Sequence, residues 1–301
     1  MTYKDPMTTS SPSTGAASDF RDLGALIQST WDQLDDAGNI PTGFAELDEV
    51  TTGLPRGSLT VIGSHPGVGS STLALGIARS AAIRHGIPAA YLTLDDTTER
   101  ITQRVLSAEA KIKLYDLRSR RMSDDDWTRL ARRASEIQEC PLVITRPTSR
   151  EITTLVDQIE DLVTHKQVGL VVVDSLHLVT ARSALPYENR EREVAEVGRV
   201  LKQLALDHDI AVVTTAQLSA NPGPRMPSPP APTLADLRDS GSVAHVADYV
   251  VLLYRPDAWE RDDPRGGEAD LILAKNRHGR TCTCTVAHQL HLCRFVDMAR
   301  G

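Results

Sequence analysis

Residues 61–75, VIGSHPGVGSSTLAL, constrain the fold of this chain more than any other stretch. They join an apolar run, a turn rich in glycine and proline, and a segment with helical periodicity. Strand, glycine-rich turn and helix in this order suit a phosphate-binding loop, because glycines let backbone N–H groups converge on an anion and the helix N-terminus adds a favourable dipole. The stretch therefore predicts an α/β fold with a phosphate site at the turn.

The central cation of such a loop is missing. The usual pattern ends in Gly-Lys-Ser or Gly-Lys-Thr, whereas this one ends in Gly69-Ser70-Ser71. Ser70 stands at the lysine position, and Ser64 stands where the first glycine is expected. A charge-assisted contact to phosphate contributes about 1.5–3 kcal/mol to binding, and Ser70 offers only one neutral hydrogen bond. The larger loss is expected at the transition state of phosphoryl transfer, where charge spreads over the phosphoryl oxygens.

Composition narrows the class of protein. The 301 residues are 41% hydrophobic and 24% charged, as in soluble globular proteins. The net charge of −7 argues against a broad, nonspecific nucleic-acid surface, although a local basic channel inside a ring stays open. Four cysteines suggest no disulfide framework. Without a bilayer-length apolar run or a signal peptide, we expect a cytoplasmic protein.

The organisation of the chain follows from composition and periodicity. Residues 1–18 are rich in Ser, Thr, Pro and Gly, which predicts a disordered tail. Residues 19–38 contain an amphipathic helix up to residue 36, which packs either on its own domain or on a neighbouring subunit. The main domain is expected at 39–301. Within it, residues 221–233 contain six prolines and are predicted to form a mobile loop or spacer.

Apolar strands alternate with helical segments through the main domain, which predicts a mostly parallel sheet. Expected strands are 59–62, 89–94, 141–145, 169–174, 210–215, 249–254 and 269–274, followed by a hairpin over 281–296, with helices expected at 71–85, 150–165 and 190–208. In folds of this class the ligand crevice lies at the carboxyl ends of the parallel strands. Polar residues just after strands are therefore the candidates for function.

Asp174 is the strongest of these candidates, because it ends a run of four apolar residues. At a strand tip an aspartate can hold the hydration shell of Mg²⁺ beside bound phosphates. Gln217 follows another strand and either senses a terminal phosphate or caps a helix. Asp95 and Asp96 follow the strand 89–94, and Asp96 is assigned to capping the next helix.

Two further clusters have simpler structural explanations. The basic run at 118–121 is expected on a solvated helix or loop face. The spacing of the cysteines and histidines between Cys282 and Cys293 fits none of the common zinc patterns. Alternation along a terminal hairpin accounts for it.

With these residues in place, the chain resembles the C-terminal RecA-like domain of the DnaB family of replicative helicases, from about Ile40 to Met298. The most specific match is DLRDSGSVAHVADYVVLLYR at 236–255; VVVDSLHL at 171–178 and AKNRHG at 274–279 are also similar. The resemblance implies a RecA-like P-loop NTPase fold with a twisted, mostly parallel central sheet flanked by helices. We expect no counterpart of the family's N-terminal helical domain before residue 19. A RadA- or KaiC-like ATPase is a weaker relative.

The resemblance implies ATP and Mg²⁺ as cofactors. Ser71 would bind the metal, and Asp174 would hold its water. Asp95 stands where the family places a catalytic glutamate, and it keeps the carboxylate with one methylene less. The nucleotide would be bound by Pro66, Gly67, Val68, Gly69, Ser70, Ser71 and Thr72.

Other roles implied by the resemblance concern the γ-phosphate and neighbouring subunits. Gln217 would sense the γ-phosphate, while Lys275 and Arg277 would reach into the site of the adjacent subunit. The helix at 19–36 resembles the linker helix that docks on that subunit in a hexameric ring. The implied partners are therefore further copies of the chain, single-stranded DNA and other replication proteins, with no membrane. Candidate DNA contacts are Arg182, Arg190 and Arg225, a thin basic complement.

Three hypotheses follow from the missing lysine. The first is a DnaB-like ATPase and helicase with a rebuilt site, in which His65 or the trans-acting Lys275 and Arg277 replace the lost cation. The second is a ring or interaction protein that binds nucleotide but hydrolyses it poorly or not at all. The third is a RadA- or KaiC-like regulatory ATPase. The two departures, Ser70 and Asp95, favour family membership with weakened or absent hydrolysis.

Overall fold

The computed structural model describes residues 22–34, 38–181, 190–218, 230–237, 241–260 and 262–298. The chain divides into two units between Gly38 and Asn39. In the first unit, α1 (Leu23–Leu34) is a helix whose described apolar side chains are exposed, including Trp31 at 64%. The predicted tail at 1–18 and residues 221–229 of the proline-rich segment lie outside the described residues.

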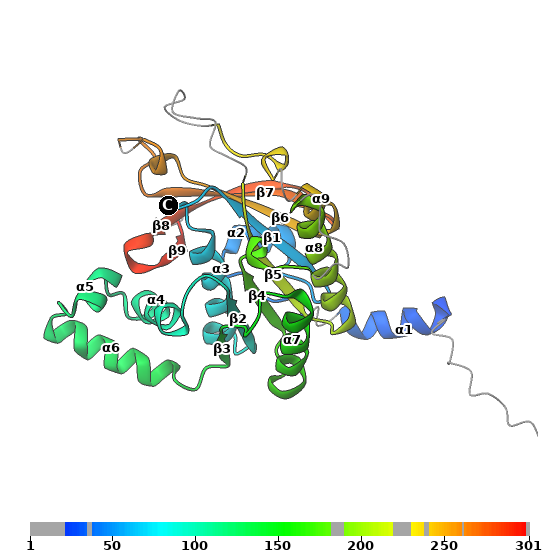
Figure 1. Cartoon of the computed structure of the whole chain (residues 1–301), viewed down its shortest axis with the longest axis horizontal. Coiled ribbons are helices and arrows are strands. Elements are labelled where there is room, and N and C mark those ends of the chain that lie inside the picture. Colours follow the sequence, from blue (N-terminus) through cyan, green and yellow to red (C-terminus); the bar gives the residue numbers. More distant parts are fainter. Residues whose placement is uncertain are drawn as a thin grey trace, which may run out of the picture. The chain divides into compact units, whose positions relative to one another are not determined.

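A single sheet organises the second unit (Figure 1). In the described part of the chain its order is β3-β2-β4-β5-β1-β6-β7-β8-β9. The strands from β3 to β6 in this order are parallel, and the remaining three are antiparallel. This confirms the predicted α/β fold with a mostly parallel sheet. The strands are β1 (Leu59–Ser64), β2 (Ala89–Thr93), β3 (Leu142–Thr145), β4 (Leu170–Asp174), β5 (Ala211–Gln217), β6 (Tyr249–Tyr254), β7 (Glu268–Asn276), β8 (Cys282–Gln289) and β9 (Arg294–Asp297).

The central strands are buried on both faces. In β4 every side chain from Leu170 to Val173 is fully covered. Because side chains alternate along a strand, Leu170 and Val172 join one apolar cluster while Val171 and Val173 join another. Helices on both sides of a parallel sheet require this near-continuous apolar sequence. The β4 sequence LVVVD is therefore apolar until its last residue, Asp174, which emerges at the carboxyl end.

Helices cover the two faces of the sheet, and Figure 1 shows α3 and α4 on the side opposite α7 and α8. The first cluster takes its side chains from α2 (Ala45–Thr51), α3 (Ser70–Arg79), α4 (Thr98–Ala110) and α6 (Asp124–Ile137). The second takes them from α7 (Ile152–Lys166), α8 (Arg190–Asp207) and α9 (Gly241–Val246). A short helix, α5 (Leu114–Ser119), packs beside α4.

The helix after the phosphate loop differs from its prediction. Sequence periodicity predicts one helix over 71–85, whereas α3 ends at Arg79 and continues as a π-helical turn, η1 (Ser80–Arg84). Such turns insert one extra residue into a helix and often mark functional positions. No helix in the described ranges is long and apolar enough to cross a bilayer.

Candidate functional site

The predicted phosphate loop lies at the centre of the sheet, between β1 and α3. Gly67 and Gly69 have φ angles of +80° and +119°, a region that side chains other than glycine rarely adopt. A Cβ placed on Gly67 would meet no atom within 4 Å, so open space lies beside the loop. Helix α3 begins at Ser70, where Gly69 is the cap and its carbonyl accepts the Leu73 N–H at 2.9 Å. The loop thus presents the backbone of a helix N-terminus to open space.

The C-terminal strands support the outer side of the loop. A Cβ on Gly69 would lie 3.0 Å from Cζ of Phe295, a residue of β9. Arg255, directly after β6, donates from Nη1 to the Val68 carbonyl at 3.3 Å. Asp257 holds the guanidinium of Arg255 at 3.0 Å. The loop is therefore fixed on this side by packing and by an arginine.

Asp174 forms the second part of the site, at the end of β4. Its Oδ1 accepts hydrogen bonds from Ser71 Oγ at 3.0 Å and from Thr215 Oγ1 at 2.5 Å. Its Oδ2 accepts one from the Tyr91 hydroxyl at 2.5 Å. Burial and the neighbouring Asp174 carboxylate raise the pKa of Tyr91 well above its usual value, so the phenol stays protonated and donates.

Sequence reasoning missed Tyr91 and Thr215. Both side chains are buried, Tyr91 in β2 and Thr215 in β5, the strands on either side of β4. A signal was present in each strand, because AAYLTL and AVVTTAQ interrupt apolar runs with hydroxyl groups. Buried hydroxyls need partners. Asp174 is that partner for both.

Two more candidates lie at the same edge of the sheet. Thr93 pairs in register with Asp174, and the Leu94 N–H donates to the Asp174 carbonyl at 2.8 Å. Asp95 follows immediately and is exposed. Gln217 is exposed and pairs in register with Ser64 at the start of the phosphate loop. The carboxyl ends of the four neighbouring strands β2, β4, β5 and β1 therefore bring the loop, Asp95, Asp174 and Gln217 together.

Asp96 has structural partners. Its Oδ1 accepts the Thr97 N–H at 2.9 Å at the start of α4, and its Oδ2 accepts Arg104 Nη2 at 2.8 Å. The helix cap itself is Thr97, whose hydroxyl accepts the Arg100 N–H. The sequence assignment of Asp96 as the cap of this helix is therefore wrong by one residue, because the capping side chain is that of Thr97.

The oxygen atoms at the edge of the loop fit Mg²⁺. This hard cation prefers a few protein oxygens together with waters and phosphate oxygens. Ser71 Oγ and Asp174 Oδ1 lie 3.0 Å apart beside the open face of the loop. The donor set and its position are therefore compatible with a magnesium nucleotide.

His65 does not fit the role of a substitute cation. Its side chain is 8% exposed, and burial lowers the pKa of its imidazole below 6.5, while Asp236 opposes the shift. The ring packs edge-on against Trp259 with centroids 5.4 Å apart. A neutral imidazole near pH 7 brings no positive charge to the loop, so this arrangement does not favour His65 as the replacement cation.

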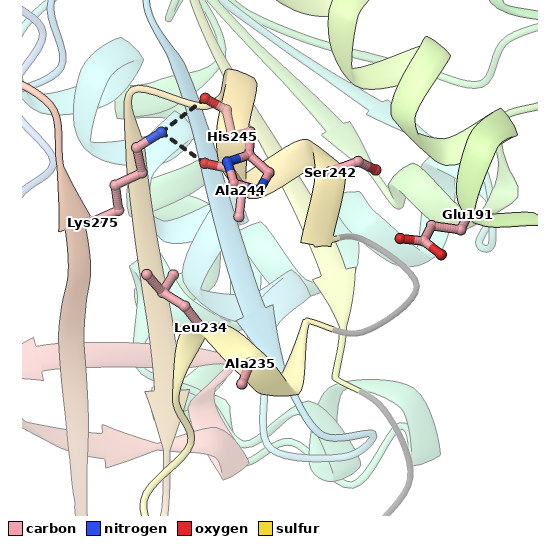
Figure 2. A pocket seen from close by; sticks show the side chains of 7 residues that line it. All are labelled: Glu191, Leu234, Ala235, Ser242, Ala244, His245 and Lys275. Atoms are coloured by element: carbon pink, nitrogen blue, oxygen red, sulfur yellow. Dashed lines mark hydrogen bonds between the residues drawn. The ribbon is translucent and has the colours of Figure 1, made fainter.

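Lys275 and Arg277 lie at the amino ends of the parallel strands, opposite the carboxyl ends that carry the phosphate loop. Strand β7 runs antiparallel to β6, and Lys275 pairs with Val250 near the start of β6, whereas the phosphate loop follows the end of β1. The Lys275 amine donates to the carbonyls of Ala244 at 2.7 Å and His245 at 3.0 Å (Figure 2). Burial lowers the pKa of Lys275. Neither residue can therefore reach the phosphate loop of its own chain.

A pocket of about 620 Å³ opens beside Lys275, and Glu191 lies on its far side (Figure 2). Arg277 donates from Nη1 to Asp248 at 3.3 Å. The described residues that line the pocket are Glu191, Leu234, Ala235, Ser242, Ala244, His245 and Lys275.

Of the three arginines predicted to contact DNA, the structure describes one. Arg190 begins α8 and donates to the carbonyls of His177 at 2.6 Å and Val179 at 3.0 Å, besides pairing with Glu193. Arg182 and Arg225 lie outside the described residues. A role for these arginines in DNA binding stays a prediction.

The cysteines and histidines of the terminal strands have local partners. Cys282 and Cys284 lie with their Sγ atoms 3.7 Å apart on β8, and burial raises the pKa of Cys284 to about 12. His288 lies 2.6 Å from Asp257. In the described ranges no three His, Cys, Asp or Glu side chains gather in a way that could hold a metal ion.

A family model and curated relatives that match this chain both describe DnaB-like helicases. The model of the DnaB-like helicase C terminal domain matches residues 39–297. A replicative DNA helicase DnaB from Mycobacterium leprae is 51% identical over 231 residues, which is 77% of this chain and 38% of that protein. The chain thus spans well under half the length of this relative.

Two of the solved structures that match illustrate the shared fold. One is described as an ATPase domain; it superposes with a TM-score of 0.81 at 23% identity, and the match covers 93% of this chain and 100% of that domain. The other, a KaiC-like protein from Pyrococcus horikoshii, has a TM-score of 0.57 at 17% identity, with 86% and 97% of the two chains covered. At these identities the likeness concerns the fold alone.

Proposed function

We propose, from the premise that this chain belongs to the family of DnaB-like helicase C-terminal domains, that it binds Mg-ATP at the phosphate loop and hydrolyses it slowly. The proposal extends to a ring of identical subunits that takes part in DNA replication. Support for the replication role comes from the 51% identical relative, which is a replicative helicase.

One observation carries the nucleotide proposal. Ser71 and Asp174 are joined by a 3.0 Å hydrogen bond beside a loop whose glycines leave open space for an anion. Bound Mg²⁺ would neutralise charge on the phosphate oxygens. Ser71 and Asp174 would hold it, and the N–H groups at the start of α3 would bind the phosphates.

Slow hydrolysis follows because Ser70 lacks the positive charge of a lysine. The nearby Arg255 does not replace that charge, because it donates to a backbone carbonyl of the loop at 3.3 Å and holds the loop from outside. We assign Asp95 to positioning the attacking water, since it is exposed next to the end of β4. Its shorter side chain reaches less far than a glutamate. Gln217, at the neighbouring strand end, is the proposed sensor of the γ-phosphate.

Ring formation accounts for the position of Lys275 and Arg277. They lie at the sheet edge remote from their own phosphate loop, so they can serve a nucleotide only on another subunit. We propose that they do so, that α1 links adjacent subunits, and that single-stranded DNA passes the arginine-bearing loops. A nucleotide-binding ring without turnover is the main alternative. A KaiC-like regulatory ATPase is a weaker one, supported by fold alone.

The test compares Mg-ATP binding and hydrolysis by the full chain with and without single-stranded DNA. Wild type is expected to bind Mg-ATP, to turn over slowly, and to gain turnover in Ser70→Lys. Asp174→Ala should abolish hydrolysis in both backgrounds.

The outcomes separate the alternatives. DNA-stimulated turnover in wild type that Asp174→Ala abolishes supports a motor. A wild type that binds ATP without hydrolysing it, while Ser70→Lys hydrolyses, supports the nucleotide-binding ring. Absence of ATP binding in both proteins would overturn the nucleotide proposal.

A further inference from the structure

A cluster of arginines gathers at the end of α3 that is remote from the phosphate loop. Arg79, Arg84 and Arg294 line one small cavity together with Ser80 and Gly43. Helix α3 has ten residues and is therefore about 15 Å long, so this cavity is separate from the proposed nucleotide site. Its remaining lining residues are Thr42, Phe44, Gly76, Phe295 and Val296.

The positive charge of this cluster is only partly neutralised. Glu109 pairs with Arg79, but it is shared with Arg133 at 2.6 Å. Among the described residues no carboxylate forms an ion pair with Arg84 or Arg294, and Arg294 donates from Nε to the neutral amide oxygen of Gln289 at 2.7 Å.

The other acidic side chains near the cavity are engaged by backbone groups. Asp48 accepts the N–H groups of Thr42 at 2.9 Å and Gly43 at 3.2 Å. Asp297 accepts the Ala45 N–H at 3.2 Å. Burial and then the charge of Arg79 lower the pKa of Arg294, with Arg84 adding to this and Glu109 opposing it. The cavity itself is lined by three arginines and by no carboxylate, so its lining carries net positive charge.

A buried hydroxyl without a partner lies in the same cavity. Ser80 is 4% exposed, and its Oγ has no hydrogen-bond partner in the described structure. Buried hydroxyl groups in folded proteins are nearly always paired, because an unpaired one costs about 1–3 kcal/mol. Ser80 begins the π-helical turn η1, and Arg84 ends it.

Gly43 packs directly against this hydroxyl. A Cβ on Gly43 would lie only 2.5 Å from Ser80 Oγ and 3.8 Å from Arg84 Nη1, so the bare backbone of Gly43 leaves room for the Ser80 side chain and lies close to both polar groups. Gly43 has a φ of +90°, which also favours glycine. The cavity lined by the three arginines and Ser80 has a volume of about 20 Å³, enough for one or two water-sized groups. A single oxyanion group can insert its oxygens there, and a nucleoside cannot.

We propose that Ser80, Arg84 and Arg294 form a binding site for a phosphate group, distinct from the phosphate loop. Guanidinium groups bind phosphate oxygens with paired, charge-assisted hydrogen bonds, and a dianion matches two unneutralised arginines better than a carboxylate does. The Ser80 hydroxyl donates to a phosphate oxygen that enters the cavity. Because the carboxyl end of a helix disfavours anions, the arginine side chains supply the attraction.

The experiment titrates the full chain with inorganic phosphate by calorimetry, at constant ionic strength and with chloride as the reference anion. The phosphate loop is filled with excess MgADP in a parallel titration. Wild type should bind phosphate equally in both, whether or not MgADP itself binds. Arg294→Gln and Arg84→Gln should each raise the phosphate Kd about tenfold or more. Arg132→Gln, an exposed arginine of α6, is the matched control and should not change it.

Ser80→Ala separates binding from a structural role. Without phosphate this variant should unfold at the same or a higher temperature than wild type, because it removes an unpaired buried hydroxyl. With phosphate its thermal shift should fall to less than half that of wild type. A variant that loses stability equally with and without phosphate would overturn the role of Ser80.

Three results would overturn the site itself. Chloride could bind as tightly as phosphate does, which would mean that any anion screens the arginine charges. MgADP could abolish phosphate binding, which would assign the anion to the loop. An oligonucleotide without terminal phosphates could compete as well as phosphate does, which would assign the cluster to a nucleic-acid backbone. Failure of ATP binding leaves these measurements unaffected.

Discussion

The carboxylate of Asp174 depends on hydroxyl donors from three different elements. Ser71 comes from the helix after the phosphate loop, Tyr91 from β2 and Thr215 from β5. Asp174 is 7% exposed, so water does little to replace a missing donor. The site thus has its carboxylate oriented before any ligand arrives.

Removing one of these donors should be costly. In Tyr91→Phe, Asp174 loses a short hydrogen bond in a buried setting, and we expect the free energy of unfolding to fall by about 1–3 kcal/mol. Denaturant unfolding measures it. Tyr249→Phe is the control, since Tyr249 is equally buried and lies beyond β5 and β1 from β4. Equal losses in both variants would contradict a specific role for the Tyr91 hydroxyl.

His65 predicts a pH dependence of stability. Burial lowers its pKa in the folded state below the value of 6.5. As pH falls through 6.5, the unfolded chain binds a proton that the folded chain resists, so stability present above this pH is lost below it. Wild type should lose more stability than His65→Gln between about pH 7.5 and 5.5, as measured by denaturant unfolding. Parallel pH profiles would count against a buried neutral imidazole.

At the scale of elements, Asp248 joins three parts of the fold at the amino-terminal edge of the sheet. Its Oδ2 accepts the Leu59 N–H of β1 at 2.8 Å and the Lys202 amine of α8 at 2.7 Å. Its Oδ1 lies 3.3 Å from Arg277, just beyond β7. The carboxylate is 3% exposed and therefore bridges a strand start, a helix and a strand end in one buried contact.

Asp248→Ala should destabilise the fold strongly. It leaves Lys202, 16% exposed, without its carboxylate, and losing one partner of a buried ion pair costs about 3–5 kcal/mol. Chemical denaturation is the measurement. Asp207→Ala, an exposed aspartate at the end of α8, should change stability by no more than about 0.5 kcal/mol. A small loss in the free energy of unfolding for Asp248→Ala would show that water replaces the carboxylate as the partner of the Lys202 amine.

The elements that sequence predicted best are those defined by local patterns. Strand β4 with Asp174, and the loop between β1 and α3, follow from apolar runs and glycine positions. The missed contacts, Tyr91 and Thr215 with Asp174, join residues 83 and 41 positions apart. They depend on strand order, which periodicity does not contain. The π-helical turn after Arg79 was missed for a different reason, since SAAIR is equally compatible with an ordinary helix.

At the scale of the whole molecule, α1 forms a unit of its own with exposed apolar side chains. Leu23, Ile27 and Trp31 are spaced four residues apart and are 73%, 47% and 64% exposed. Residues at this spacing share one face of a helix. This face is the one we assign to contact with an adjacent subunit.

Trp31→Asp should therefore weaken self-association without changing the unfolding of the second unit. Sedimentation velocity over a concentration series measures the first, and thermal unfolding the second. Trp127→Asp, at a 53% exposed tryptophan on α6, is the matched control. Unchanged sedimentation of Trp31→Asp would exclude α1 as the linking element.

Because β7 runs antiparallel to β6, the two ends of the strands in each protomer carry different groups. One edge of its sheet carries the phosphate loop, and the other carries Lys275 and Arg277. In the assembly that we propose, protomers joined head to tail would complete one composite site at every junction, so an open row would always have one site fewer than it has members. Only a closed row uses every loop and every lysine–arginine pair. If ATP hydrolysis depends on these composite sites, the hydrolysis rate per chain would rise when the row of protomers closes. An isolated protomer would then hydrolyse no ATP.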